Sequence, residues 1–297
     1  MPEFNKITAQ LAKKCEINDG IFVYLPEITA WQKKEIDFHD TICSSEEELH
    51  QLRSWRNFYY HQYFQDYLLA LGKNAILLEI GAGSGSDGLA LLKNGARLIE
   101  SDISLASIKA IKAKAKQQSL DNDQQIVYLV ADGASLPLPT HSVDAVFLVA
   151  AFHHFEQQDE VLREILRVLK VDGLLVMGME PSRFMMSFTK LFSNFKSLHN
   201  TSGSSTADDN HKGYSFHDWE NLTKGYDLTL LDLKRVWLML GFWHYGSEAI
   251  FRFFKLKKRL KLPLALEKTL RIIDEWLLKI PALWKFNWHF IAVFKKN

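Results

Sequence analysis

Residues Leu77 to Gly88 read Leu-Leu-Glu-Ile-Gly-Ala-Gly-Ser-Gly-Ser-Asp-Gly, an apolar run that breaks into four glycines. The run from Ala75 to Ile80 has the length and composition of a buried strand. Glycine allows positive φ and a close approach of the backbone to a ligand, which a sharp turn from a strand into a helix requires. The stretch therefore predicts a nucleotide-binding turn.

Two glycine spacings overlap in this turn. Gly83, Gly85 and Gly88 fit the GxGxxG pattern of NAD-binding proteins, whereas Gly81, Gly83 and Gly85 fit a tighter GxGxG. Either pattern alone is weak evidence. The first glycine should follow the strand directly, and Gly81 does so, which favours the tighter pattern and makes an NAD-dependent dehydrogenase the weakest alternative.

The chain beyond the turn alternates between helical and extended patterns. Helices are expected at 87–94, 104–118 and 159–169, with Ser104 as a helix N-cap, and strands at 96–101, 125–131, 143–150 and 173–179. Alternating strands and helices predict a parallel, doubly wound α/β sheet with right-handed crossovers.

Further elements are expected before and after this alternating region. We expect one or two helices at 46–71, a mobile loop at 200–213, and two further strands at 226–237 and 288–295. A turn signal, Asn18-Asp19-Gly20, indicates a hairpin near the amino terminus. About 50 residues with Trp, Phe, Leu and Lys at helical spacings separate the last two strands and predict a helical insertion.

Composition limits the class of protein. The chain has 297 residues, 47% of them hydrophobic, which is enough to fill a core. Cys15 and Cys43 lack CxxC spacing, so we expect neither disulfides nor a cysteine zinc site, and we predict no metal. No signal peptide or membrane-spanning stretch is evident, and the expected location is cytoplasmic.

Acidic residues and histidines follow the predicted strands. Asp102 lies 21 residues after Gly81, where a carboxylate can accept both ribose hydroxyls of a nucleoside; the alternative is a solvated loop aspartate. Asp132 can accept from an adenine amine or can cap a turn. Glu79 has apolar neighbours and needs a partner to stay charged, either a ligand ammonium or a buried Lys or Arg.

Four blocks between residues 75 and 179 carry a family resemblance. They are Leu78-Glu79-Ile80-Gly81-Ala82-Gly83-Ser84-Gly85, then Glu100-Ser101-Asp102-Ile103-Ser104, then residues 131–139 with Ala131-Asp132-Gly133, then residues 142–170 with His153-His154. In this order and spacing they resemble the class I S-adenosylmethionine (SAM) methyltransferases of the ubiquinone/menaquinone type. The family's usual Pro-Gly-Gly after the last block is Val171-Asp172-Gly173 here, and one glycine still serves the turn.

The resemblance implies a Rossmann-like fold with a seven-stranded sheet in the order 3-2-1-4-5-7-6. It implies residues 1–72 as an amino-terminal helical cap or lid and residues 73–297 as the methyltransferase domain, with the helical insertion at 238–286. SAM is the implied cofactor. The residues expected to bind it are Glu79, Gly81, Ala82, Gly83, Gly85, Asp102, Ile103, Asp132, Gly133 and Ala150.

Methyl transfer from a sulfonium requires alignment and, for many acceptors, a group that removes a proton. His153 and His154 end the fourth strand of the alternating region, and histidine is readily poised near neutral pH. We expect one of them to be catalytic, although a purely structural histidine is an equal alternative. His39, Tyr59 and Tyr60 are lid candidates, for which simple packing is the competing interpretation.

The insertion is basic as well as aromatic. Residues 252–297 carry 12 Lys and Arg against Glu267, Asp274 and Glu275, a net charge of +9, which leaves −8 on the rest. The insertion can be a helical cap with snorkelling Lys and Arg stems, a lid over an apolar acceptor, or a peripheral contact with anionic membrane.

The leading function is therefore methyl transfer from SAM to an oxygen, nitrogen or carbon of a small, apolar, possibly lipid-like acceptor. An RNA or protein methyltransferase is an alternative because of the basic tail. Against it, the basic residues alternate with bulky aliphatics and an Asn-Pro-Pro-Tyr motif is missing. A SAM-binding protein without catalytic activity is a third possibility.

Overall fold

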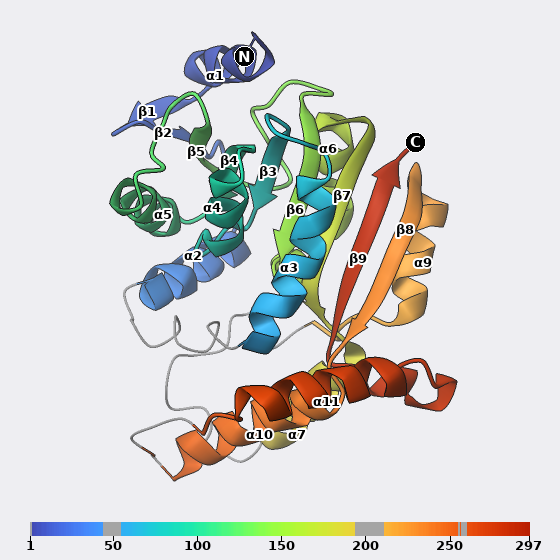
Figure 1. Ribbon diagram of the computed structural model, residues 1–297. Helices are drawn as coiled ribbons and strands as arrows, with labels where there is room; N and C mark the ends of the chain where they lie inside the picture. Colours follow the sequence, from blue (N-terminus) through green and yellow to red (C-terminus); the bar gives the residue numbers. More distant parts are fainter. Residues whose placement is uncertain (1, 44–54, 194–210, 255, 257–259) are drawn as a thin grey trace.

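The computed structural model describes residues 2–43, 55–193, 211–254, 256 and 260–297. Its strands are β1 (Glu16–Asn18), β2 (Ile21–Tyr24), β3 (Ile76–Ile80), β4 (Arg97–Asp102), β5 (Ile126–Ala131), β6 (Val143–Val149), β7 (Leu169–Pro181), β8 (Leu228–Val236) and β9 (His289–Lys296). They form one sheet in the order β1-β2-β5-β4-β3-β6-β7-β9-β8 (Figure 1).

The sheet corrects the prediction of seven strands. It has nine, and its order differs because β1 and β2 extend the edge beyond β5. The strands from β5 to β8 follow the order implied by the family, with β9 antiparallel to both β7 and β8. The two added strands have three and four residues, too few for a clear hydrophobic period.

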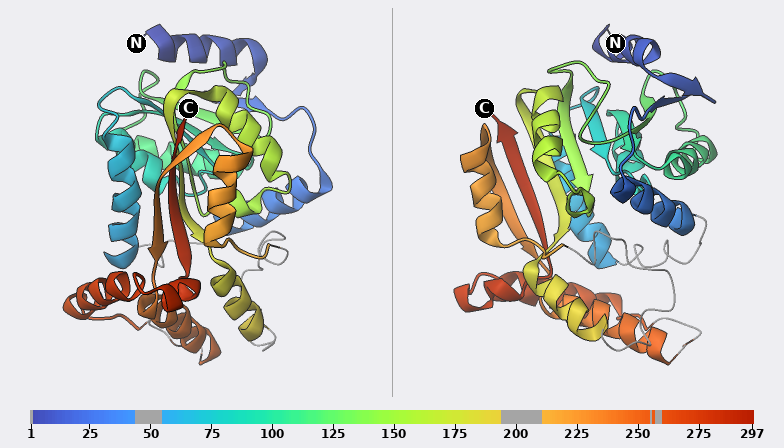
Figure 2. Two further views of the ribbon diagram at one scale, coloured as in Figure 1. Left: turned by 90° about the vertical axis from the view of Figure 1, so that its right-hand side faces the viewer. Right: turned by 180° about the vertical axis from the view of Figure 1, so that it is seen from behind.

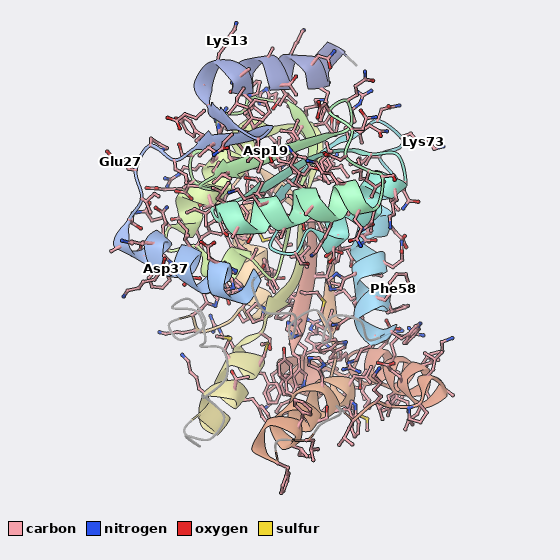
Figure 3. The ribbon with its side chains drawn as sticks, turned by 90° about the vertical axis from the view of Figure 1, so that its left-hand side faces the viewer. Lys13, Asp19, Glu27, Asp37, Phe58 and Lys73 are labelled. Atoms are coloured by element: carbon pink, nitrogen blue, oxygen red, sulfur yellow. The ribbon has the colours of Figure 1, made fainter. Side chains whose placement is uncertain are left out.

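The hairpin at Asn18-Asp19-Gly20 is confirmed, and it joins the main sheet. Asp19 and Gly20 have φ of 50° and 67°, the left-handed geometry of a two-residue hairpin turn. β2 then pairs in parallel with β5. Figure 3 shows Asp19 at this turn and Lys13 on the outer side of the preceding helix. Part of the predicted helical cap at 1–72 is therefore a sheet edge.

Helices pack on both faces of the sheet and beyond one of its ends. They are α1 (Pro2–Lys14), α2 (Ala30–Cys43), α3 (Trp55–Leu69), α4 (Ser86–Lys93), α5 (Leu105–Gln117), α6 (Gln158–Val168), α7 (Arg183–Ser193), α9 (Phe216–Gly225), α10 (Met239–Phe253) and α11 (Leu264–Leu277), with 3-10 turns η2 (Phe152–His154) and η3 (Pro281–Phe286).

Alternation along the strands divides the core in two. In β3, Ile76, Leu78 and Ile80 contribute to the cluster that contains α1, α6 and α9, whereas Leu77 contributes to the cluster with α3, α4 and α5. Successive strand residues point to opposite faces, so one apolar run fills both layers. The predicted doubly wound arrangement follows from this geometry (Figure 2).

Most predicted elements of the alternating region lie within a few residues of their expected bounds. Ser104 is the N-cap of α5, and its side chain accepts from Ser107 N. The helix expected within 46–71 includes α3, while residues 46–54 lie outside the described part of the chain. The same is true of residues 200–210 of the expected loop.

The insertion at 238–286 contains α10, α11 and η3. With α7, these helices lie beyond one end of the sheet, below the strands in Figure 1. β7 and β8 run into α7 and α10, so this is the end where the parallel strands terminate. Within the described ranges, no helix combines the length and the apolar character required to cross a bilayer.

Candidate functional site

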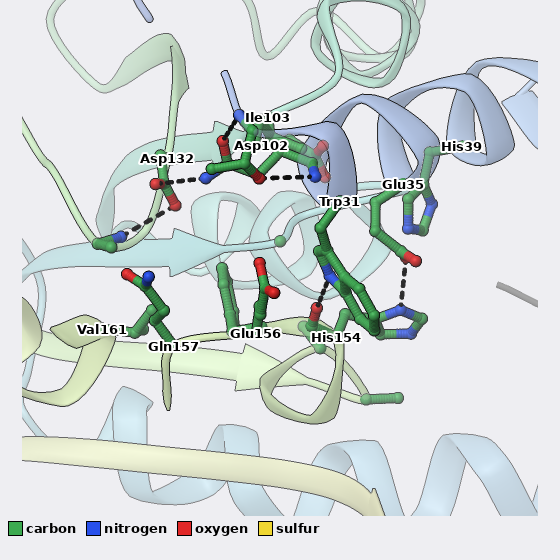
Figure 4. Close-up of a pocket in the computed structure, with 17 residues that line it drawn as sticks. Trp31, Glu35, His39, Asp102, Ile103, Asp132, His154, Glu156, Gln157 and Val161 are labelled. Atoms are coloured by element: carbon green, nitrogen blue, oxygen red, sulfur yellow. Dashed lines mark hydrogen bonds and ion pairs between the residues drawn. The ribbon is translucent and has the colours of Figure 1, made fainter. Parts of the chain in front are cut away.

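A cavity opens at the carboxyl ends of the central strands, between the glycine turn and α2. Seven residues predicted for the site line it: His39, Gly81, Asp102, Ile103, Asp132, Ala150 and His154. Figure 4 shows Asp102 and Asp132 in one part of the cavity and Glu35, His39 and His154 together in another. This is the edge where ligands bind in doubly wound sheets.

The glycine turn has the backbone geometry expected from the sequence. Gly81, Gly83 and Gly85 have φ of 69°, 49° and 66°. A Cβ on Gly81 would lie 2.8 Å from Cβ of Ala151, and one on Gly85 would lie 2.7 Å from Ile111. Both conformation and space therefore require glycine at these two positions.

Asp102 ends β4 and is held by backbone donors. Gly83 N donates to one carboxylate oxygen and Ser104 N donates to the other, each at 2.8 Å. Each carboxylate oxygen has a second acceptor position, so Asp102 can still accept the two hydroxyls of a ribose. The bond to Gly83 fixes this carboxylate against the glycine turn, as a nucleoside site requires.

Asp132 connects the end of β5 to α2. Ala134 N donates to Oδ1 at 3.1 Å, and Gln32 Nε2 of α2 donates to Oδ2 at 2.7 Å. The turn contact is thus present, and Asp132 also lines the cavity. The sequence analysis missed that Gln32 reaches this carboxylate.

Glu79 lies elsewhere than its predicted role requires. It is buried beneath Gly88, whose N–H donates to Oε2 at 3.1 Å, and it neighbours the buried Glu100. Burial, with Glu100 and Asp87 close by, raises the pKa of Glu79 well above its usual value. Burial also raises the pKa of Glu100 to about 7. Two buried carboxyls side by side disfavour their charged forms, so retention of a proton by this pair would remove the need for the expected ammonium, Lys or Arg partner.

His153 is bound to the interior. Its Nδ1 lies 2.9 Å from Oε2 of Glu180, which also accepts from the backbone N–H groups of Ala151 and Phe152. Burial opposes the charge on Glu180, but the hydrogen bond and charge of His153 and the backbone donors lower the pKa of Glu180 below its usual value. Glu180 therefore fixes the η2 turn, and His153 is part of that anchor.

His154 faces α2. Its Nδ1 lies 3.1 Å from Oε2 of Glu35, and its backbone carbonyl accepts from Trp31 Nε1 at 3.3 Å. The ring of His39 lies 5.6 Å from that of His154, centroid to centroid, in an edge-on arrangement. Of the two histidines predicted to be catalytic, His154 lines the cavity, and a carboxylate orients its ring.

Glu35, His39 and His154 also form a set of metal-ligand type. Each offers one ligand atom, and these atoms lie within 4.8 Å of one another. Two imidazoles and a carboxylate are a ligand set that zinc uses in proteins. The prediction of no metal rested on the absence of paired cysteines. This set contains no cysteine, so that argument does not apply to it.

Tyr59 and Tyr60 correct the lid prediction. Tyr59 Oη accepts from Arg271 of α11 at 3.0 Å, and Tyr60 is fully buried near Trp237. Both residues belong to α3, on the side of this helix that packs away from the cavity, and neither lines the cavity. Helical periodicity predicted the helix but could not show which layer it packs against.

The remaining predicted residues lie in turns next to the cavity, and several lining residues were missed by the sequence analysis. Ala82, Gly83, Gly85 and Gly133 support the turns without lining the cavity, while Thr29, Trp31, Gln32 and Glu35 line it from α2 and the residue before it. Positions 31, 35 and 39 are four apart, so they share one side of a helix. That spacing was the signal available in the sequence.

Comparisons with known proteins agree with this geometry. Residues 78–177 match the family model described as a methyltransferase domain. The fold and the cofactor cradle define a Rossmann-like methyltransferase. Residues 78–177 are thus a methyltransferase domain of the class I SAM-dependent type, for which S-adenosyl-L-methionine is the cofactor.

Two curated relatives are similar over this same part. The 27-O-demethylrifamycin SV methyltransferase of Amycolatopsis mediterranei (strain S699) is 29% identical over 111 residues, 37% of this chain and 40% of that protein. The demethylmenaquinone methyltransferase of Clavibacter sepedonicus is 29% identical over 100 residues, 34% of this chain and 39% of that protein. The matches span about two fifths of the relatives' length.

Two solved structures share the fold over most of the chain. The N-methyltransferase NodS from Bradyrhizobium japonicum WM9, in complex with S-adenosyl-L-homocysteine, has a TM-score of 0.53 at 13% identity over 89% of this chain and 98% of that one. The cyclase SpnF has a TM-score of 0.51 at 15% identity over 99% and 92%. At these identities the likeness concerns the fold alone.

Proposed function

We propose that the protein transfers a methyl group from SAM to an oxygen, nitrogen or carbon of a small, apolar acceptor. The observation that carries the proposal is one cavity that joins the Asp102 end of the cofactor cradle to the His154–Glu35 pair. A donor site and a group able to accept a proton are the two parts that methyl transfer to a hydroxyl or amine needs.

In this proposal SAM supplies an electrophilic methyl group, and Asp102 accepts hydrogen bonds from its ribose. Asp132 faces the adenine. His154 takes the proton from the acceptor, while Glu35, buried in α2, orients the imidazole. His153 acts through Glu180 as a positioning residue for η2.

The apolar nature of the acceptor is supported by the cavity lining. Trp31, Ala134, Phe155 and Val161 contribute side chains without charge. The rifamycin and menaquinone methyltransferases are named for small-molecule substrates, which supports the same class here. The acceptor atom and the cytoplasmic location stay predictions.

Two measurements test the proposal. Calorimetry should show binding of SAM in preference to NAD. Methyl-labelled SAM should then label an organic-soluble small molecule from the source cells, and His154→Gln should abolish that labelling while it retains SAM binding.

Label in RNA or protein instead would support the alternative acceptors. SAM binding without transfer to any fraction would favour a non-methylating role. SpnF, a protein of this fold named as a cyclase, shows that the fold alone does not decide between them.

A further inference from the structure

The carboxylates of α11 all face the protein. Glu267 is 5% exposed and lies 2.8 Å from Arg56 of α3. Asp274 is fully buried and accepts from the backbone N–H groups of Leu238, Met239 and Leu240 at the start of α10. Glu275 pairs with Lys234 of β8 at 2.9 Å. The inner side of α11 is thus its polar side.

The outer side is apolar. Six large side chains are exposed by 37% to 64%, and we call them the α11 face: Leu264, Leu266, Ile272, Ile273, Trp276 and Ile280. Residues three, four and seven apart lie on one side of a helix, so Leu266, Ile273 and Trp276 form one stripe, with Ile272 beside it one turn before Trp276. A surface helix of a soluble protein normally has the opposite arrangement, and a contiguous exposed apolar patch marks an interaction surface.

The charge around this face has one sign. Lys261, Lys268 and Lys279 are exposed, whereas each of the three carboxylates in the stretch 260–286 is buried or partly buried in an ion pair or a helix cap. Exposed aliphatics, a tryptophan and lysines together fit the boundary between headgroups and acyl chains of an anionic bilayer.

The position of α11 agrees with such an occupant. α10 and α11 lie beyond the end of the sheet at which β7 and β8 enter their helices (Figures 1 and 2). His154 follows the end of β6, and β6 runs parallel to β7. The α11 face and the cavity therefore belong to the same end of the molecule.

We propose that the α11 face docks on an anionic lipid surface, with Ile272, Ile273 and Trp276 entering the headgroup boundary and the lysines facing lipid phosphates. This orientation leaves the cavity end of the molecule toward the bilayer. Docking itself does not depend on the proposed methyl transfer. Together with the proposed methyl transfer, this docking would let a membrane-borne acceptor reach the cavity without crossing bulk water.

The test is sedimentation of the full chain with vesicles of phosphatidylcholine alone or mixed with phosphatidylglycerol. We expect binding to the mixed vesicles that weakens as salt is added. Ile272→Ser should reduce the partition coefficient about tenfold, since an isoleucine side chain is lost from the apolar phase. Ile17→Ser is the matched control, because Ile17 is 56% exposed on β1 and Ile272 is 58% exposed.

Charge is tested separately. Lys279→Glu should reduce binding to the mixed vesicles at least about fivefold, and Lys13→Glu on α1 should leave it unchanged. Equal binding to both vesicle types, equal losses in the control variants, or no binding would overturn the proposal. A dimer that Ile272→Ser dissociates, without vesicle binding, would assign the face to a second copy of the chain.

Circular dichroism and SAM binding of each variant should match the starting protein, since the substituted side chains are exposed. A failure of SAM binding in the unmodified protein would contradict the proposed function and leave the vesicle result intact.

Discussion

His154 Nδ1 and Oε2 of Glu35 lie 3.1 Å apart, although 119 positions separate the two residues in sequence. His154 comes from the turn after β6 and Glu35 from α2, so the pair forms only while α2 covers the cavity. A base whose orientation depends on the covering helix becomes competent when the site is closed. In the proposed function, closure by α2 and proton removal by His154 are therefore coupled.

Replacing His154 tests this role. We expect His154→Gln to reduce kcat about 100- to 10,000-fold, the range for loss of a general base, with little change in SAM affinity. His217→Gln, on the exposed side of α9, is the control. Full activity of His154→Gln would remove proton transfer from this residue.

Asp102 should control cofactor affinity. Asp102→Ala removes charge-assisted hydrogen bonds, each worth about 1.5 to 3 kcal/mol, and should weaken SAM binding about ten- to a hundredfold. Calorimetry measures this directly. Asp123→Ala, at an exposed loop position, should bind SAM normally. Unchanged affinity of Asp102→Ala would contradict the ribose assignment.

The buried Glu79–Glu100 pair predicts a pH-dependent stability. Burial raises the pKa of Glu100 to about 7 from 4.5. A raised folded-state pKa means that the folded protein holds the proton more tightly than the unfolded chain does. The contribution of Glu100 to the free energy of unfolding is therefore complete below a pH of about 4.5 and is lost as the pH rises through about 7. Glu100→Gln should therefore be more stable than the original chain above pH of about 8. Thermal unfolding curves across this interval measure the difference.

Glu16→Gln, at an exposed position on β1, serves as the control for this series. Parallel pH profiles of the original chain and Glu100→Gln would show that the pair does not share a proton.

Glu180 should contribute to stability in the opposite pH direction. The hydrogen bond from His153 lowers its pKa against the effect of burial, so its contribution is present above the usual carboxylate pKa and is lost on acidification. Glu180→Gln should cost about 3 kcal/mol in urea unfolding at neutral pH, because a buried charged pair is broken. It should also reduce kcat through displacement of η2. Glu27→Gln, which is exposed, should do neither.

The Glu35, His39 and His154 set predicts inhibition by zinc. Added Zn²⁺ should bind these ligand atoms and block the base, and His39→Ala should relieve the inhibition because one ligand is lost. Chelators should leave the activity of the purified protein unchanged. Loss of activity with a chelator, restored by one metal, would instead make that metal part of the reaction.

The geometry of the glycine turn and its contact with Asp102 could be predicted because the signals for them are local. A strand followed by Gly81, and an acid at the end of the next strand, are positioned by hydrogen bonds within a few residues of the turn. Such contacts depend on backbone geometry that short sequence patterns specify. The same explains the confirmed N-cap at Ser104.

The contacts that could not be predicted depend on packing between residues far apart in the sequence. Glu79 lies in β3 beside Glu100 of the neighbouring strand, and only the pairing of β3 with β4 brings these two carboxyls together. Glu35 and His154 meet through the placement of α2 over the sheet. Tyr59 fits the packing alternative, but its contact with α11 could not be predicted, because a helix with aromatic residues on several sides does not indicate which neighbour it packs against.

The short β2 strand determines how the cavity can open. β2 pairs with β5 up to Tyr24 and Ala131, so the chain leaves the sheet directly beside Asp132. Residues 25–29 then lead into α2 and span at most about 17 Å when extended. The start of α2 is thus tethered beside Asp132, and the Gln32–Asp132 bond and the Glu35–His154 pair together hold the helix over the cavity.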